Sequence, residues 1–278
     1  MTPTNTSPGQ TSLEELIQLL DLERIETNLF RGQHPASRKR RLFGGQIISQ
    51  SVMAAARTVD EAFHPHSLHA YFLRPGDWRL PALFEVDRIR DGRSFVTRRV
   101  KVIQNGQAIF NMDASFHVRE PGLAHQFKAP PAYAPPDEAS MSEGLKKRPF
   151  LGFQVDYKEK IKPVPQAPEQ YWWIKANGPV PDDPLLHLAL LAYQSDEALL
   201  GTARLPHRGS YDSGKLQVAS LDHSLWFHHD INVSDWLLYA LDSPNMGHGR
   251  GYTRGEIYTA EGKLVASCMQ EGLIRQLD

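Results

Sequence analysis

The order of apolar and polar residues predicts a helix followed by several strands in the first half of the chain. An apolar helix is expected to begin at Phe43 and to continue through the alanines at 54–56. Alternating apolar positions then predict strands over 67–73, 82–89, 95–104 and 108–116. The last two strands flank Asn105-Gly106, a dipeptide that favours a type I′ hairpin turn because both central positions accept a positive φ.

The same succession of elements returns in the second half. A strand is predicted over 171–176, and Asp183-Pro184 indicates a helix start, with a capping residue followed by proline at the first helical position. The helix predicted over 185–200 is apolar almost all round, which indicates burial on several sides. Further strands are predicted over 216–227, 252–259 and 264–275.

The two halves can be laid on each other. Thr97 and Thr253 are 156 positions apart, and so are the turn glycines Gly106 and Gly262. Ser67-Leu68 and Ser220-Leu221 are 153 positions apart, and the two helices are offset by about 140. A repeat of this size predicts two copies packed side by side, each with a sheet around its own buried helix. From the pattern alone, two unrelated α+β domains with similar hairpins remain an alternative.

The repeat and the composition between its copies predict four segments. We expect a flexible tail over 1–10, an N-terminal unit over 11–120, a linker over 121–168 and a C-terminal unit over 169–278. The linker contains nine prolines and little periodicity. A short helix over 13–20 is expected to open the N-terminal unit, because Ser12 and Glu15 form a capping-box pattern.

Composition limits the classes of partner and the compartment. The chain has 278 residues, 41% of them hydrophobic and 23% charged, with a net charge of -1, so neither nucleic acid nor a membrane surface is an expected partner. The apolar run over 185–192 is too short to span a bilayer. Cys268 is the single cysteine, which excludes an internal disulfide and suits a reducing compartment. The polar N-terminus and the absence of a C-terminal Ser-Lys-Leu favour a cytoplasmic protein.

Several longer strings, spread from Leu22 to Arg275, resemble the acyl-CoA thioesterase II family. They are Leu29-Phe30-Arg31-Gly32-Gln33, Phe43-Gly44-Gly45-Gln46, the segments 69–77 and 90–95, the segments 222–228 and 235–239, and Gln270-Glu271-Gly272. The resemblance implies an α+β double hotdog, in which two antiparallel sheets each wrap around a long helix. It also implies hydrolysis of medium- to long-chain acyl-CoA by an activated water, without a metal, a cofactor or a covalent acyl-enzyme. Exposed sheet edges and the resemblance together predict a homo-oligomer, a dimer or a tetramer.

The resemblance also implies the residues that hold the water. In that family these are an aspartate on the second helix, a threonine or serine on the next strand and a glutamine on the last strand, which here are Asp196, Ser220 and Gln270. Burial of Asp196 deep in an apolar helix would raise its pKa toward that of a useful base. Ser220 and Gln270 each donate and accept hydrogen bonds, so they can orient a water molecule beside that carboxylate.

Other candidate groups are weaker. Asp222-His223 has the composition of a catalytic pair, but adjacent strand residues point to opposite faces, whereas Ser220 and Asp222 are expected on the same side. Asp222 is therefore predicted to support the site or an interface. His223, His228 and His229 lack a second cluster with metal-ligand spacing.

Two further features bear on mechanism and substrate. Cys268 is expected to be a small buried hydrophobe rather than a nucleophile, and the sequence contains no G-x-S-x-G elbow. The basic run Arg38–Arg41 is a candidate for binding the CoA phosphates, with a solvated surface as the alternative.

Two competing functions stay open beside hydrolysis. A hotdog enoyl-CoA hydratase or dehydratase would require an Asp–His pair acting on one substrate. A non-catalytic acyl-CoA-binding protein would keep the fold and lose the three water-holding residues. The presence of all three residue types favours the thioesterase.

Overall fold

The structure, a computed structural model, describes residues 8–34, 42–127, 133–138, 148–155 and 164–277. Two groups of elements follow one another along the chain. The N-terminal half contains α1 (Pro8–Leu20), β1 (Glu23–Glu26), β2 (Leu29–Gly32), α2 (Gly44–Ala56), β3 (Phe63–Phe72), β4 (Ala82–Asp91), β5 (Phe95–Gln104) and β6 (Gln107–Val118). The C-terminal half contains β7 (Phe150–Gln154), β8 (Glu169–Ala176), α3 (Pro184–Ser195), α4 (Leu199–Ala203), β9 (Leu216–Ser220), β10 (Asp222–Phe227), β11 (Leu237–Gly247), β12 (Arg250–Thr259) and β13 (Leu264–Gln276).

The strands form one antiparallel sheet whose order repeats in the two halves. Along the sheet the order is β1-β2-β4-β5-β6-β3-β10-β13-β12-β11-β8-β7, and β9 pairs with β13. From the central seam outward, β3-β6-β5-β4-β2 therefore corresponds to β10-β13-β12-β11-β8. The seam is the antiparallel pair β3–β10, in which Leu68 faces Leu225. The two predicted sheets are thus joined edge to edge, and the predicted double-hotdog architecture is confirmed.

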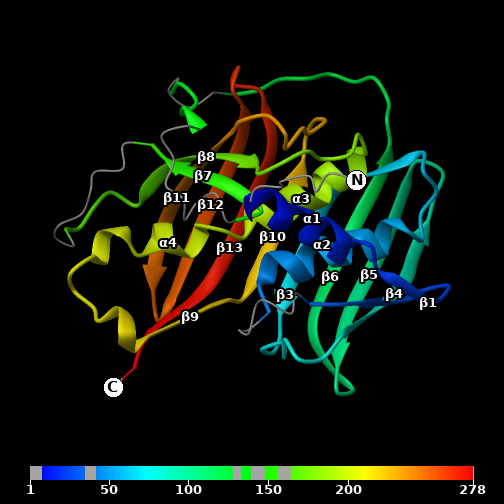
Figure 1. The fold of residues 1–278 in the computed structure, drawn as a ribbon, viewed down its shortest axis with the longest axis horizontal. Helices are drawn as coiled ribbons and strands as arrows, with labels where there is room; N and C mark the ends of the chain where they lie inside the picture. Colours follow the sequence, from blue (N-terminus) through cyan, green and yellow to red (C-terminus); the bar gives the residue numbers. More distant parts are fainter. Residues whose placement is uncertain (1–7, 35–41, 128–132, 139–147, 156–163, 278) are drawn as a thin grey trace, which may run out of the picture.

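The two long helices lie next to each other over the sheet (Figure 1) and contact one another. Both are buried over most of their length, and their side chains join those of the sheet in one hydrophobic core that crosses the seam. α1 packs on α2. The two helices run antiparallel. The beginning of α2 lies at the end of α3, and the end of α2 lies near the beginning of α3.

The hairpin between β5 and β6 confirms the predicted turn. Asn105 and Gly106 both have positive φ, 48° and 70°, as a type I′ turn requires.

The second helix ends earlier than predicted. The sequence over 185–200 predicts one helix, but α3 ends at Ser195, Asp196 is its C-cap residue, and a separate short helix, α4, begins at Leu199. Between them Ala198 has a φ of 69°, a left-handed conformation that no helix can continue through. Asp196 therefore lies at the end of a helix rather than inside one.

The strand predicted over 216–227 is divided at Leu221. The Leu221 N–H donates to Glu271 of β13, while its carbonyl accepts from Phe72 of β3. β9 and β10 both pair with β13, but their registers differ by one residue, since Ser220 lies opposite Gly272 and Ser224 lies opposite Met269. This division separates β9 from β10 and alters which side chains share a face.

Several elements were not predicted from the pattern. β7 lies inside the segment predicted to be a linker and pairs with β8. β1, β2 and β11 are also additions to the predicted strands. α1 begins at Pro8, so Ser12 is inside the helix rather than its cap. Within the described residues, no helix has both the length and the apolar character needed to cross a membrane.

Candidate active site

A cavity of about 1310 Å³ lies where the start of α2 meets the end of α3. Both halves of the chain line it. The N-terminal half contributes Phe43, Gly44, Ile47, Phe72 and Phe110, and the C-terminal half contributes Phe150, Trp172, Ile174, Tyr193, Asp196, Ser220, Tyr239 and Gln270, among others. Many of these residues are aromatic or aliphatic, and a group of polar side chains lies at the junction of the helices.

Asp196 is positioned by contacts from two distant parts of the chain. Its Oδ2 accepts a hydrogen bond of 2.9 Å from the backbone N–H of Gly45, at the beginning of α2. Its Oδ1 accepts a hydrogen bond of 3.2 Å from the Ser220 hydroxyl. Asp196 thus lies against the positive end of the α2 dipole, which favours a negative charge there.

The approach of Asp196 to α2 depends on two glycines. A Cβ atom on Gly44 would lie 2.6 Å from Asp196 Oδ2, and one on Gly45 would lie 2.1 Å from the carbonyl oxygen of Tyr193. The N-cap residue Phe43 offers no side-chain hydrogen bond to the helix. The carboxylate of Asp196 therefore takes the place of an ordinary N-cap.

Ser220 and Gln270 complete the group. Ser220 is the last residue of β9, and Gln270 lies on β13, the strand that pairs with it. The Gln270 amide nitrogen Nε2 donates to Ser220 Oγ over 2.9 Å, and Gln270 is almost fully buried. The structure thus brings Asp196, Ser220 and Gln270, named from the sequence, into one hydrogen-bonded group that faces the cavity.

The pKa of Asp196 is raised from 3.8 to about 7, first because burial disfavours the charged form. The neighbouring charge of Glu197 acts in the same direction. Hydrogen bonds from Gly45, Ser220 and Gln270 oppose the rise because they stabilise the carboxylate. A carboxylate with this pKa exchanges protons near neutral pH, which suits a general base.

His223 contacts the same group, and the sequence interpretation missed it. It is fully buried on β10, with Nδ1 2.7 Å from Gln270 Oε1 and Nε2 2.9 Å from Ser195 Oγ. Burial lowers its pKa to about 4, although the hydrogen bond with Gln270 acts against this. Alternate residues of β10 are buried, and this pattern could have indicated that His223 points inward. Which residues point inward depends, however, on the break at Leu221.

Asp222 does not belong to this group. It occupies one of the partly exposed positions of β10, and its Oδ1 accepts from the backbone N–H of Glu271 over 2.6 Å. The prediction that Ser220 and Asp222 face the same side is wrong, because the register against β13 shifts by one residue at Leu221 and resets the alternation. The prediction of a supporting role for Asp222 agrees with its contact to the backbone of β13.

Cys268 and the remaining histidines offer no second reactive centre. Burial raises the pKa of the Cys268 thiol to about 12, so it stays protonated, with its Sγ 3.0 Å from the Tyr239 hydroxyl. His228 hydrogen-bonds Ser267 on the sheet. In the part of the chain that the structure describes, no group of three His, Cys, Asp or Glu residues is arranged to hold a metal ion.

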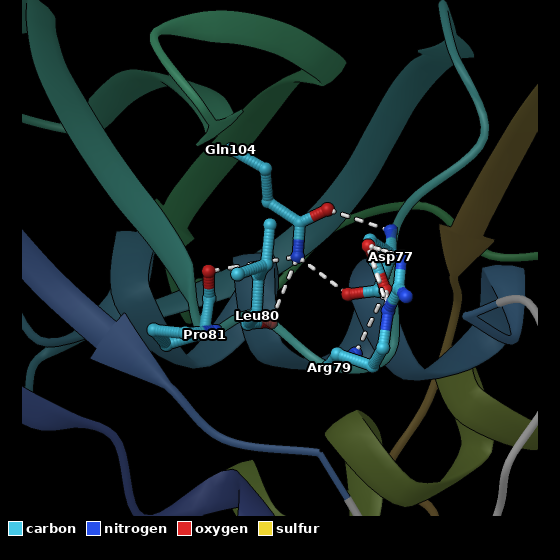
Figure 2. A network of polar contacts seen from close by, with 5 residues as sticks. All are labelled: Asp77, Arg79, Leu80, Pro81 and Gln104. Carbon is cyan, nitrogen blue, oxygen red and sulfur yellow. Dashed lines mark hydrogen bonds and ion pairs between the residues drawn. The ribbon is translucent and has the colours of Figure 1, made fainter.

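A loop from the N-terminal half forms one wall of the cavity mouth. Leu73, Arg74 and Trp78 of this β3–β4 loop line the cavity. Figure 2 shows how Gln104, at the end of β5, holds the loop: its Oε1 accepts from the N–H of Asp77, and its Nε2 donates to the carbonyls of Asp77 and Leu80. Asp77 also pairs with Arg79. One buried amide thus fixes the loop's backbone.

Three arginines lie at the cavity, Arg74, Arg148 and Arg204. Arg148 is exposed and 3.8 Å from Glu197, and Arg74 donates to the carbonyl of Ala108. The basic run Arg38–Arg41, named from the sequence as a candidate for phosphate binding, lies outside the described residues.

Comparison with known proteins identifies the class of this fold and site. The family model for the N-terminal domain of acyl-CoA thioesterases matches residues 33–117, and the model described as acyl-CoA thioesterase matches residues 153–273. The chain is 39% identical to human acyl-coenzyme A thioesterase 8, over 96% of this chain and 91% of that protein. It is 37% identical to acyl-CoA thioesterase 2 of Haemophilus influenzae, over 95% and 98% respectively.

A solved structure agrees with these relatives. An acyl-CoA thioesterase II from Mycobacterium marinum superposes with a TM-score of 0.80 at 42% identity, over 94% of this chain and 97% of that one. The chain belongs to the acyl-CoA thioesterase family and is a thioester hydrolase with the hotdog fold.

Proposed function

We propose that this enzyme hydrolyses medium- to long-chain acyl-CoA with a water molecule held by Asp196, Ser220 and Gln270. The observation that carries the proposal is the convergence of these three side chains at an apolar cavity, with hydrogen bonds of 3.2 Å and 2.9 Å between them. Family membership supplies the reaction class, and the hydrogen-bonded group supplies a base beside two groups that orient water.

The reaction needs one proton transfer in each direction. Asp196 accepts a proton from the water as its oxygen attacks the thioester carbonyl carbon, and the carbonyl oxygen becomes an oxyanion near the positive end of α2. When the tetrahedral intermediate collapses, the carbon–sulfur bond breaks and the proton passes from Asp196 to the departing CoA sulfur. The products are a fatty acid and CoA, and Asp196 returns to its ionised form.

The cavity lining supports an acyl chain as the other part of the substrate. Phe43, Phe72, Phe110 and Phe150 lie around the polar group, so an alkyl chain beside them would leave water for an apolar surface. Arg148 and Arg204, at the same cavity, are suited to the phosphates of CoA.

The hydratase or dehydratase alternative receives less support. It requires Asp222 and His223 to act on one substrate, but Asp222 binds the backbone of Glu271 while His223 is buried against Gln270. If the purified protein releases no thiol, non-catalytic acyl-CoA binding is the function that remains.

The test measures release of the CoA thiol from a series of acyl-CoAs of about 4 to about 18 carbons. The chain length increases in steps of about two carbons, so that the series covers a range of pocket sizes. We expect Asp196→Asn to lower kcat by about 100- to 10,000-fold, the usual contribution of a general base. Ser220→Ala removes the hydroxyl, whereas the matched Ser220→Thr keeps it. Comparing the two variants separates the effect of the hydroxyl on activity from the effect of the space around it. Full activity of Asp196→Asn would refute the proposed mechanism.

Cytoplasmic localisation and assembly into a dimer or tetramer stay predictions from the sequence. Fractionation of the native host and light scattering of the purified protein would test them.

A further inference from the structure

We propose that His223 is a positioning residue, which holds the Gln270 amide in one orientation by donating a hydrogen bond from Nδ1. The inference rests on the proposed function, because it concerns how Gln270 is presented to the water and substrate. His223 itself does not reach the cavity lining, whereas Gln270 does.

The five side chains involved form a closed chain of hydrogen bonds. Ser195 contacts His223, His223 contacts Gln270, Gln270 contacts Ser220, and Ser220 contacts Asp196, with donor–acceptor distances from 2.7 to 3.2 Å. Ser195 and Asp196 are consecutive at the end of α3. Both ends of the chain of contacts are therefore anchored on the same helix.

The direction of these hydrogen bonds follows from the ionised form of Asp196. A carboxylate only accepts, so the single hydroxyl hydrogen of Ser220 is directed to Asp196. Ser220 Oγ then accepts from the Gln270 amide nitrogen, which places the amide oxygen against His223. Because an amide oxygen only accepts, the hydrogen between them belongs to His223 Nδ1.

The other ring nitrogen fits this assignment. Burial keeps the pKa of His223 near 4, so at neutral pH the imidazole carries one hydrogen and Nε2 accepts. The Ser195 hydroxyl, 2.9 Å away, is the available donor, and it also lies 3.0 Å from the carbonyl of Ala192. The neutral Nδ1–H tautomer thus supplies the donor that Gln270 Oε1 requires, while the single Ser195 hydrogen serves either His223 Nε2 or the Ala192 carbonyl.

The consequence for the site is the presentation of donors. With its oxygen held by His223, the Gln270 amide turns both N–H groups away from β10, one to Ser220 and the other toward the Asp196 carboxylate at the cavity. Rotation of the amide by half a turn would place its oxygen against Ser220 Oγ, which would then face two acceptors with one hydrogen. The His223 donor excludes that arrangement.

Two isosteric substitutions separate the two ring nitrogens. In His223→Asn the side-chain NH2 lies close to the position of Nδ1, and in His223→Gln it lies close to that of Nε2. We expect His223→Asn to keep kcat within about threefold, and His223→Gln to lower kcat by about 10- to 100-fold with KM little changed, the range found for partners that orient a functional group.

A second measurement is independent of activity. In protein with ¹⁵N-labelled histidine at pH 8, the signals lost in His223→Asn assign His223, and wild type is expected to show a protonated Nδ1 and an unprotonated Nε2. Equal losses of kcat in both variants, full activity of His223→Gln, or a protonated Nε2 would each overturn the proposal.

The two proposals fail in different ways. If Asp196→Asn keeps full activity, the proposed function fails even where the tautomer is as expected. If Asp196→Asn is inactive but His223 carries its hydrogen on Nε2, only the positioning role fails.

Discussion

The two halves have the same strand order, but the ends of their helices are completed in different ways. α3 is capped by a residue of its own half, since the Asp183 carboxylate accepts from the N–H groups of Leu185 and Leu186. α2 has no such side chain, and Asp196 of the opposite half accepts from Gly45 instead. The proposed catalytic carboxylate is therefore also the cap of the other half's helix.

The equivalent positions of the N-terminal half lack this chemistry. At an offset of 140 Asp196 corresponds to Ala56, and at an offset of 156 Gln270 corresponds to Ala114. The strand registers then match His223 with Leu68 and Ser220 with Pro65. A second cavity, of about 1230 Å³, lies at the opposite ends of the helices and includes Ala56 in its lining. The fold thus produces two clefts, and four side chains distinguish the one proposed to be catalytic.

Two arginines on corresponding strands point to opposite faces of the sheet and so do different work. Arg98 and Arg254 are 156 positions apart and occupy equivalent strands. Arg98 is buried and donates to the hydroxyl and carbonyl of Thr58, just beyond the end of α2. Arg254 pairs with Asp242 on the exposed face of the sheet. A guanidinium therefore anchors the end of α2, whereas the end of α3 is open to the cavity.

Among substitutions outside the proposed catalytic group, the largest effect is expected at the contact between the halves. Gly45→Ala would place a methyl group 2.1 Å from the Tyr193 carbonyl, so α2 has to move away from Asp196. We expect kcat to fall by about 100-fold or more, as misplacement by about 1 Å does in other enzymes. Gly122→Ala is the matched control, because a Cβ there meets nothing within 4 Å. Equal activity of the two variants in the thiol assay would contradict the packing argument.

Substitution of Arg98 and of Arg254 allows the two strands to be compared through the free energy of unfolding. Arg98→Met should lower the free energy of unfolding by about 3 kcal/mol, because it leaves the Thr58 and Arg90 carbonyls without their donors. Arg254→Met removes an exposed ion pair and should cost about 1 kcal/mol or less. Urea unfolding of both variants measures the difference, and similar losses would show that burial does not separate the two arginines.

Asp196 predicts a pH dependence in both activity and stability. Activity requires the ionised form, so kcat/KM should fall about tenfold per pH unit below the pKa of about 7 and level off above it. A raised carboxyl pKa means that the folded state holds its proton longer than the unfolded state, so stability decreases as pH rises from about 4 to about 7. Asp196→Asn should abolish that decrease, which thermal unfolding of both proteins across this pH range would detect.

The smallest effect is expected for the single cysteine. Cys268→Ser keeps a small polar group beside the Tyr239 hydroxyl. The thiol of wild-type Cys268 is too weakly acidic to be a nucleophile. Thiol release should therefore stay within about twofold of wild type, since the substitution touches no reacting group. Loss of activity in a variant that melts like wild type would indicate a covalent mechanism instead.

The sequence by itself determined the local elements and the repeat. The Asn105-Gly106 turn was predictable because its conformation depends on two residues, and α2 because its apolar pattern is continuous. The offset of 156 positions joins corresponding strands, and long strings carried the family resemblance to Asp196, Ser220 and Gln270. Each of these signals can be recognised in the sequence without knowing how the segments pack.

Only the tertiary structure decided how those stretches meet. The end of α3 at Ser195 and the break at Leu221 were not predicted, although the sequence turns polar over 194–197 and the apolar alternation shifts between Val218 and Leu221. Neither local signal fixes where an element ends. The contact of Asp196 with Gly45 spans 151 positions, and that of His223 with Gln270 spans 47. Such contacts depend on the packing of two helices and on the register shift between β9 and β10 along β13. These are properties of the assembled sheet rather than of any single segment.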